Sequence, residues 1–141
     1  MRAGITISVW ESIPKYVIVV SDRKETKCMC ENVYDMIIVG SGPAGLTAGI
    51  YGKRAGLKVV ILESGFIQGG QIVNTYEVDN YPGMPGISGL ELAEKLKEHV
   101  PGFGVEIARG KVKGISLDGE WKIVHTKKAD YRGKAVILAA G

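Results

Sequence analysis

Unbroken apolar runs and alternating runs predict where the strands of this chain lie. Residues 36–39 and 135–138 are continuous apolar runs, and residues 58–62 are apolar after Lys58. All three have the length and β-branched content typical of strands buried on both faces of a parallel sheet. Residues 105–107 predict a short strand, and residues 111–117 alternate between apolar and polar positions as a longer one.

A hairpin and two helices complete the expected elements. Asp118-Gly119 is a hairpin turn signal, so residues 121–126 should pair with the preceding strand. One helix lies between the first two apolar runs and ends at Gly56. A second begins at the capping box Ser88-Gly89-Leu90-Glu91, in which Ser88 caps the Glu91 N–H and Glu91 reaches back. Its buried stripe comprises Leu92, Ala93, Leu96 and Val100, and Pro101-Gly102 ends it. This order predicts an α/β, Rossmann-like fold with a parallel sheet and an added β-hairpin.

The turn after the first strand carries the strongest chemical signal. Gly40, Gly42 and Gly45 have the spacing G-x-G-x-x-G. The first glycine permits a tight turn, the second lets the backbone approach a pyrophosphate, and the third lets the helix pack against the strand. Glu63 ends the second strand, where a carboxylate can accept hydrogen bonds from ribose hydroxyls. The pattern predicts dinucleotide binding; the alternative is a structural glycine turn in another α/β protein.

Residues 64–86 form a connection too long to be idle in a compact domain. It contains Gly69-Gly70-Gln71, where the backbone can approach a ligand and Gln71 offers both a donor and an acceptor. Asn80 supplies a second such amide. Either amide could instead stabilise the loop itself.

The composition of the chain limits the kinds of partner and the cellular compartment that we expect. The 141 residues carry a net charge of +3 with scattered lysines, which gives no case for nucleic acid. No apolar run approaches the roughly 20 residues that a membrane helix needs, and the N-terminus lacks the pattern of a signal peptide. We therefore expect a soluble, cytoplasmic protein without membrane contact. Cys28 and Cys30 are one residue apart, which suits neither an unstrained disulfide nor a C-x-x-C redox pair, and we expect no metal site.

Together, the segments VGSGPAGLTAGIY, GGQ, VDNYPG and ILAAG carry a family resemblance. In this order and at these spacings, the chain from Tyr34 to Gly141 resembles the N-terminal part of the FAD-binding domain of low-molecular-weight thioredoxin reductases of bacteria and archaea. The resemblance implies that residues 34–141 hold FAD, and that residues 1–33 are an N-terminal extension.

The resemblance assigns a role to each part of the expected site. The cofactor-binding residues that it implies are Gly40, Ser41, Gly42, Pro43, Ala44 and Gly45 for the pyrophosphate, Glu63 and its neighbour Ser64 for the adenosine ribose, Gly70, Gln71 and Asn80 for the flavin and its ribityl chain, the backbone near Val112 for the adenine, and Gly141 at the end of the last strand. Ala140 stands where the family has threonine, which puts that hydroxyl contact in doubt.

The same resemblance implies an electron path that this chain only begins. In the family, an NADPH domain with a redox C-x-x-C is inserted after the last of these strands, and electrons pass from NADPH to FAD, then to a disulfide and to thioredoxin or a similar small redox protein, in a homodimer. The chain stops where the insertion would begin, so we expect it to lack the nicotinamide site and any catalytic residue, and to be inactive alone. We also expect the strand at 135–138 to lie at an edge or uncovered, as in an incomplete sheet.

Three alternatives stay open. The parent protein could be a ferredoxin/flavodoxin–NADP reductase-like flavoprotein, or a reductase that takes electrons from a deazaflavin or ferredoxin, and a C-x-x-C beyond Gly141 would separate these from thioredoxin reductase. The chain could also be a nucleotide-binding module without turnover.

The N-terminal 33 residues allow two interpretations. Apolar segments at 5–10 and 16–20 could form a hairpin laid on the sheet. Alternatively, Val33 marks a GTG start codon directly before the family's usual Tyr-Asp, and residues 1–32 are upstream sequence translated in error.

Overall fold

The computed structural model describes residues 32–65 and 69–141. The expected hairpin at 5–20 and the cysteine pair at 28 and 30 lie outside the described residues. The described elements, in chain order, are β1 (Val33–Val39), α1 (Pro43–Arg54), β2 (Val59–Glu63), the 3₁₀ helix η1 (Gly70–Asn74), α2 (Gly89–His99), the 3₁₀ helix η2 (Val100–Phe103), β3 (Glu106–Arg109), β4 (Val112–Asp118), β5 (Trp121–Thr126) and β6 (Asp130–Leu138).

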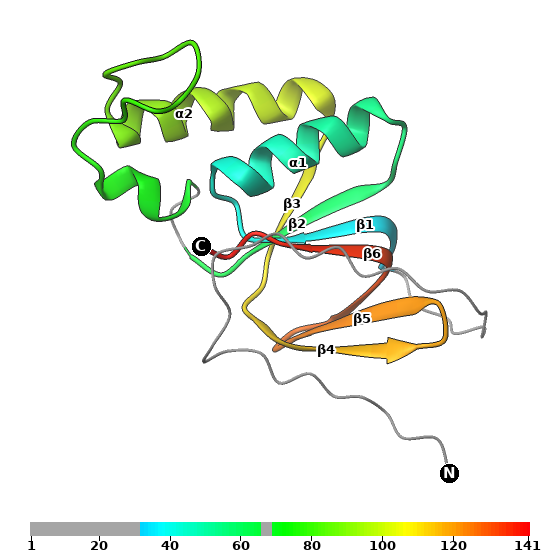
Figure 1. Cartoon of the computed structure of the whole chain (residues 1–141). Coiled ribbons are helices and arrows are strands. Elements are labelled where there is room, and N and C mark those ends of the chain that lie inside the picture. The colour runs from blue at the N-terminus through cyan, green and yellow to red at the C-terminus, as the bar shows by residue number, and fades with distance from the viewer. Residues whose placement is uncertain (1–31, 66–68) are drawn as a thin grey trace.

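One six-stranded sheet of order β3-β2-β1-β6-β5-β4 organises these elements. Strands β3, β2, β1 and β6 are parallel to one another, whereas β5 and β4 join β6 as an antiparallel hairpin. Figure 1 shows α1 and α2 on one side of the parallel strands, with the β4–β5 hairpin curling away on the other side. The Rossmann-like α/β fold with an added hairpin is therefore confirmed.

Both faces of β1 and β2 carry buried side chains, which explains the apolar runs of these two strands. On the helical face, Ile38 and Ile61 pack with α1 and α2 in one cluster. On the opposite face, Ile37 and Val60 pack with Val124 of β5 in a second cluster. Because alternate side chains of a strand point to opposite faces, β1 and β2 supply both clusters.

The two helix ends follow the expected chemistry, with one exception. Gly56, at φ 77°, takes the left-handed conformation after α1, and its N–H donates to the Lys53 carbonyl. The hydroxyl of Ser88 accepts from the Glu91 N–H at 3.2 Å, so half of the capping box forms. The other half is wrong, because the Glu91 carboxylate turns outward to Lys95 at 3.4 Å.

The end of α2 lies just before the expected stop at Pro101-Gly102. The α-helix ends at His99, and a 3₁₀ turn carries the chain through Pro101-Gly102 to Gly104, whose φ is 65°. Proline fits this turn because the first residues of a helix have no intrahelical use for their N–H groups.

The position expected for the last strand was wrong. β6 runs from Asp130 to Leu138, longer than the apolar run 135–138, and it pairs with β1 on one side and β5 on the other. The edges of the sheet are β3 and β4. The sequence pattern missed residues 130–134 because Arg132, although charged, is buried, and because strand order depends on long-range pairing rather than on periodicity.

Candidate dinucleotide-binding site

The candidate site lies where β1, β2 and β6 end at the same edge of the sheet. The Gly40 N–H donates to the Leu62 carbonyl at 2.9 Å, and the Ala139 N–H donates to the Val39 carbonyl at 2.8 Å. These bonds tie the glycine turn to β2 and to the residues after β6, so the C-terminus lies beside the turn (Figure 1). A ligand crevice at the carboxyl ends of the strands is the general expectation for an open α/β sheet.

Two glycines of the turn are required by the fold itself. Gly40 has φ 103°, and a Cβ there would lie 2.3 Å from the Ala139 carbonyl oxygen. A Cβ on Gly45 would lie 2.0 Å from the Gly40 carbonyl oxygen and 3.4 Å from the Ile38 side chain. The first and third glycines thus have the steric roles expected from the sequence.

Gly42 is different, because the fold leaves room for a side chain there. A Cβ on Gly42 would meet the Gly69 carbonyl oxygen only at 3.8 Å, an ordinary contact distance. The segment Gly69-Gly70 instead approaches Gly42: the Gly69 N–H donates to the Ser41 carbonyl at 3.1 Å, and a Cβ on Gly70 would lie 3.1 Å from the Gly42 Cα. Packing within the protein therefore does not require a glycine at position 42. A requirement for glycine there is explained instead by the close approach of a ligand to the backbone.

The start of α1 presents unopposed backbone donors at this edge. Gly42 is the N-cap residue, Pro43 occupies the first turn, and no acidic side chain is present in that turn. Ala44 is exposed and Gly45 is buried. The first turn of α1 therefore carries no acidic side chain of its own at the positive end of the helix dipole, where an anionic phosphate can bind.

Glu63 holds the turn from the side of β2. Its Oε2 accepts from the Ser41 N–H at 2.9 Å and from the Ser41 hydroxyl at 2.6 Å. Its Oε1 accepts from the Gly65 N–H at 2.6 Å, with the Ser64 hydroxyl at 3.4 Å. Burial alone would raise the pKa of the Glu63 carboxyl, but the hydrogen bonds from Ser41 and Gly65 outweigh it and hold that pKa below its ordinary value. Glu63 is thus an ionised acceptor at neutral pH.

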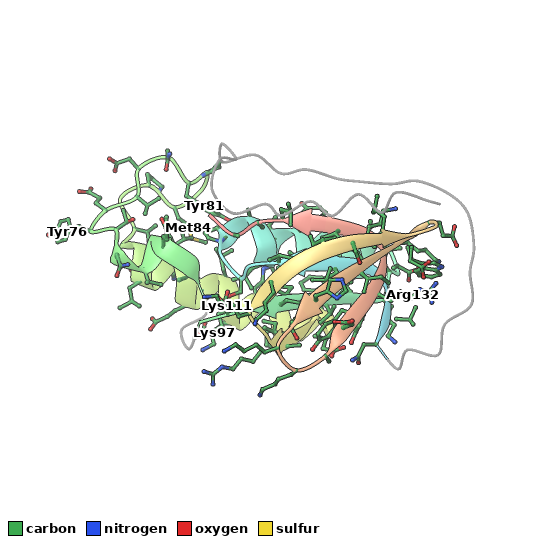
Figure 2. The ribbon with its side chains drawn as sticks, turned by 90° about the horizontal axis from the view of Figure 1, so that it is seen from below. Tyr76, Tyr81, Met84, Lys97, Lys111 and Arg132 are labelled. Carbon is green, nitrogen blue, oxygen red and sulfur yellow. The ribbon has the colours of Figure 1, made fainter. Side chains whose placement is uncertain are left out.

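The remaining expected residues surround this centre at different depths. Gln71 is the second residue of η1, and Asn80 lies in the following loop. Both are exposed, and within residues 32–65 and 69–141 neither amide makes a side-chain hydrogen bond. The interpretation that these amides only stabilise the loop therefore loses its support. Figure 2 shows this loop at one end of the molecule, with Tyr76 projecting outward.

Val112 and Gly141 frame the site from the other strands. The Gly110 N–H donates to the Glu63 carbonyl at 2.9 Å, so the turn leading into Val112 lies beside Glu63. Gly141, at φ 79°, follows β6 at the same edge as the glycine turn. The structure thus brings the glycine turn, Glu63, Gly70, the turn before Val112 and the end of β6 to one edge of the sheet, whereas Asn80 lies in the loop after η1.

Two contacts at the turn involve residues outside the predicted cofactor-binding set. Gly69 closes on the turn through its N–H, and Gly65 supplies the shortest donor to Glu63 Oε1. The adjacent glycines at 69 and 70 were a usable signal for the first. No sequence signal marks the second, because a backbone N–H carries no residue preference.

A separate polar chain crosses the hairpin. The Ser116 hydroxyl lies 2.8 Å from His125 Nε2, and His125 Nδ1 lies 3.0 Å from Asp130. This is the atom order of a catalytic triad, but each contact joins neighbouring strands on a half-exposed sheet face, as in a cross-strand polar pair. Trp121 stacks on Arg132, so the hairpin side chains pack as expected.

Glycine turn, terminal carboxylate and parallel sheet define a dinucleotide-binding α/β domain. Over residues 34–141 the chain matches the family described as pyridine nucleotide-disulphide oxidoreductase. It therefore belongs to that family, whose name implies a redox cofactor and a pyridine nucleotide.

Relatives sharpen this assignment. The chain is 47% identical to the thioredoxin reductase of Bacillus subtilis over 111 residues, which are 79% of this chain and 35% of that protein. The crystal structure of thioredoxin reductase from Streptococcus pyogenes is 46% identical with a TM-score of 0.72, over 77% of this chain and 35% of that one. A ferredoxin-flavin thioredoxin reductase from Clostridium acetobutylicum is 37% identical with a TM-score of 0.67, over 75% and 37% of the two chains. The resemblance to thioredoxin reductases is confirmed, and the chain spans about a third of the length of these relatives.

Two searches of the described residues give no further site. No helix there is long and apolar enough to cross a membrane. No group of three or more His, Cys, Asp or Glu side chains in this part of the chain gathers as metal ligands would.

Proposed function

We propose that this chain is the FAD-holding part of a thioredoxin reductase, with the pyrophosphate at Gly40–Gly45 and the adenosine ribose at Glu63. The observation that carries the proposal is the ionised Glu63 carboxylate held beside an unopposed helix N-terminus. These two features match the hydroxyls and the phosphates of an adenine dinucleotide at one edge of the sheet.

The flavin end of the site rests on the amides. Gln71 and Asn80 are exposed on the segment that closes against the glycine turn. A donor and an acceptor on each amide suit the polar edge of a flavin and its ribityl hydroxyls. When bound, FAD supplies the electron-carrying ring; the residues of this chain orient the dinucleotide and neutralise its phosphates.

The whole protein would then carry electrons from NADPH through FAD to a redox disulfide and to thioredoxin, as a cytoplasmic homodimer. The similarity to thioredoxin reductases supports this path. The similarity to a ferredoxin-flavin thioredoxin reductase favours ferredoxin as a second candidate donor. With a protein that includes the remaining length of the relatives, reduction by NADPH or by reduced ferredoxin distinguishes the two donors.

Ligand choice tests the proposal directly. Titration of the chain with FAD, followed by quenching of flavin fluorescence, should show saturable binding, and excess NAD should compete poorly. Tighter binding of NAD than of FAD would contradict the assignment.

Turnover is a second test. We expect no oxidation of NADPH by the chain with added FAD and a small aromatic disulfide, because a hydride must start from a nicotinamide held in reacting geometry and the cysteines at 28 and 30 lack C-x-x-C spacing. A rate above that of free flavin, lost on replacing Cys28 or Cys30, would contradict this expectation.

A further inference from the structure

The two oxygens of the Glu63 carboxylate have different surroundings. Oε2 faces Ser41, which is fully buried, and receives both its N–H and its hydroxyl. Oε1 faces the exposed residues Ser64 and Gly65. The N–H and the hydroxyl of Ser41 therefore hold Oε2 in place, while Oε1 lies toward solvent.

Counting acceptor positions shows which oxygen is available. An ionised carboxylate has about four lone-pair sites, two on each oxygen. The two bonds from Ser41 fill those of Oε2. On Oε1, the Gly65 N–H takes one site, and the Ser64 hydroxyl at 3.4 Å is too long to hold the other firmly.

We propose that Ser41 is a positioning residue that locks Oε2 of Glu63, so that Oε1 alone reads the hydroxyls of the ligand ribose. This inference deepens the proposed function and rests on it. It assigns Ser41 a role through its side chain, in addition to its place in the phosphate-binding turn.

The lock also sets which dinucleotides fit. Because donors of the protein hold the Glu63 carboxylate in one orientation, it presents one charged acceptor in a fixed direction. This acceptor favours a ribose with free hydroxyls and repels a ribose that carries a 2′-phosphate. Without the Ser41 hydroxyl, the carboxylate keeps only the backbone bond at Oε2 and can rotate. The preference for a ribose with a free 2′-hydroxyl should then fall more than the affinity for the phosphates does.

A matched pair of serines in the chain allows a controlled test. Ser41→Ala removes the hydroxyl that lies 2.6 Å from Glu63 Oε2, and Ser116→Ala removes a hydroxyl that contacts His125 in the β4–β5 hairpin at 2.8 Å. ADP and 2′-deoxy-ADP are the probes, with binding to the full chain measured by calorimetry. The wild type should prefer ADP by about tenfold, the scale of a hydrogen bond to a charged group.

We expect Ser41→Ala to lose most of this preference, mainly through weaker binding of ADP, whereas Ser116→Ala keeps it. Should Ser41→Ala fail to fold, Ser41→Cys, with a side chain of similar shape and a weak donor, should show the same loss. An unchanged preference in the folded variant overturns the inference, and so does an equal weakening of both probes.

A readout in the ligand-free protein separates positioning from loss of structure. Carboxyl ¹³C NMR should show the Glu63 titration midpoint moving to higher pH in Ser41→Ala and staying in place in Ser116→Ala. Arg109 of β3, which pairs with Glu63 in the sheet, is unchanged in all of these variants. An unmoved midpoint in Ser41→Ala overturns the inference.

The outcomes also distinguish the inference from the proposed function. If the wild type binds neither FAD nor ADP, the proposed function fails, and the inference falls with it. If the wild type binds both and Ser41→Ala discriminates as the wild type does, only the inference fails.

Discussion

The parallel and antiparallel parts of the sheet use the same kinds of polar residue in opposite ways. In the parallel part, Ser41 and Glu63 meet where strands end, and backbone donors of the glycine turn and α1 remain directed outward. In the antiparallel part, Ser116, His125 and Asp130 satisfy one another across β4, β5 and β6. Polar groups at the ends of strands thus keep hydrogen-bonding positions that a ligand can use. Polar side chains that face one another across neighbouring strands bond to each other instead.

Gly42→Ala should give the largest functional effect with little effect on the fold. A Cβ there has 3.8 Å to the Gly69 carbonyl oxygen, so we expect a loss of about 1 kcal/mol in unfolding free energy from the poorer N-cap. Binding of FAD should become undetectable, because the Cβ would occupy the approach of the pyrophosphate. Urea unfolding and flavin fluorescence measure the two effects, and retained binding would contradict the assignment of this turn.

Gly45→Ala should damage the fold itself. Its Cβ would lie 2.0 Å from a backbone oxygen that no side-chain rotation can move, so we expect a loss of about 3 kcal/mol in unfolding free energy. Gly114→Ala is the control from the antiparallel part, since no atom lies within 4 Å of a Cβ there. Similar midpoints of urea unfolding for the two variants would contradict the prediction.

Glu63→Ala should weaken FAD binding by about 1–3 kcal/mol, the scale of hydrogen bonds to a charged acceptor. Asp130→Ala, which removes a carboxylate from the antiparallel part, should leave FAD affinity unchanged. Fluorescence titration of the two variants in one buffer provides the comparison. Equal losses would show that net charge, rather than the place of Glu63, controls binding.

Acid should weaken the parallel part through Glu63. The folded pKa of Glu63 lies below its ordinary value of 4.5, so its stabilising contribution is present above that pH and is lost as pH falls through the folded pKa. Glu63→Gln should therefore flatten the acid limb of the plot of unfolding free energy against pH. Glu91→Gln, on the exposed face of α2, serves as the control, and parallel acid limbs for wild type and Glu63→Gln would refute the link.

Ser116→Ala should give the smallest effect, about 0.5 kcal/mol in unfolding free energy, because its contact with His125 lies on a half-exposed sheet face. FAD affinity should not change. Thermal unfolding and fluorescence titration are sufficient to check both. A large loss of FAD binding would show that the hairpin contributes to the site after all.

Local patterns predicted the elements well because local forces decide them. The hairpin strand at 121–126 has the expected bounds, and the stripe of α2 is buried as its spacing requires. The position of β6 was wrong, because pairing between strands far apart in sequence leaves no periodic trace.

Buried charges were the second obstacle. Lys122 is buried yet donates to the Glu120 carbonyl, and Arg132 is buried yet pairs with Asp118. A sequence pattern counts both as surface residues, since the partners that compensate their burial are fixed only by the fold. The site itself was predictable as a set of residues, but the locking of Glu63 by Ser41, across 22 positions, was not.

The central place of β6 also has a consequence for how the protein is made. β6 joins β1 to the hairpin through contacts that span 99 positions, such as that between Lys134 and Asp35. During synthesis, β1, α1 and β2 leave the ribosome before β6, so one side of β1 stays unpaired until residues 130–138 have been made. Closure of the sheet is therefore a late event, and the time before it is when a chaperone would have most to protect.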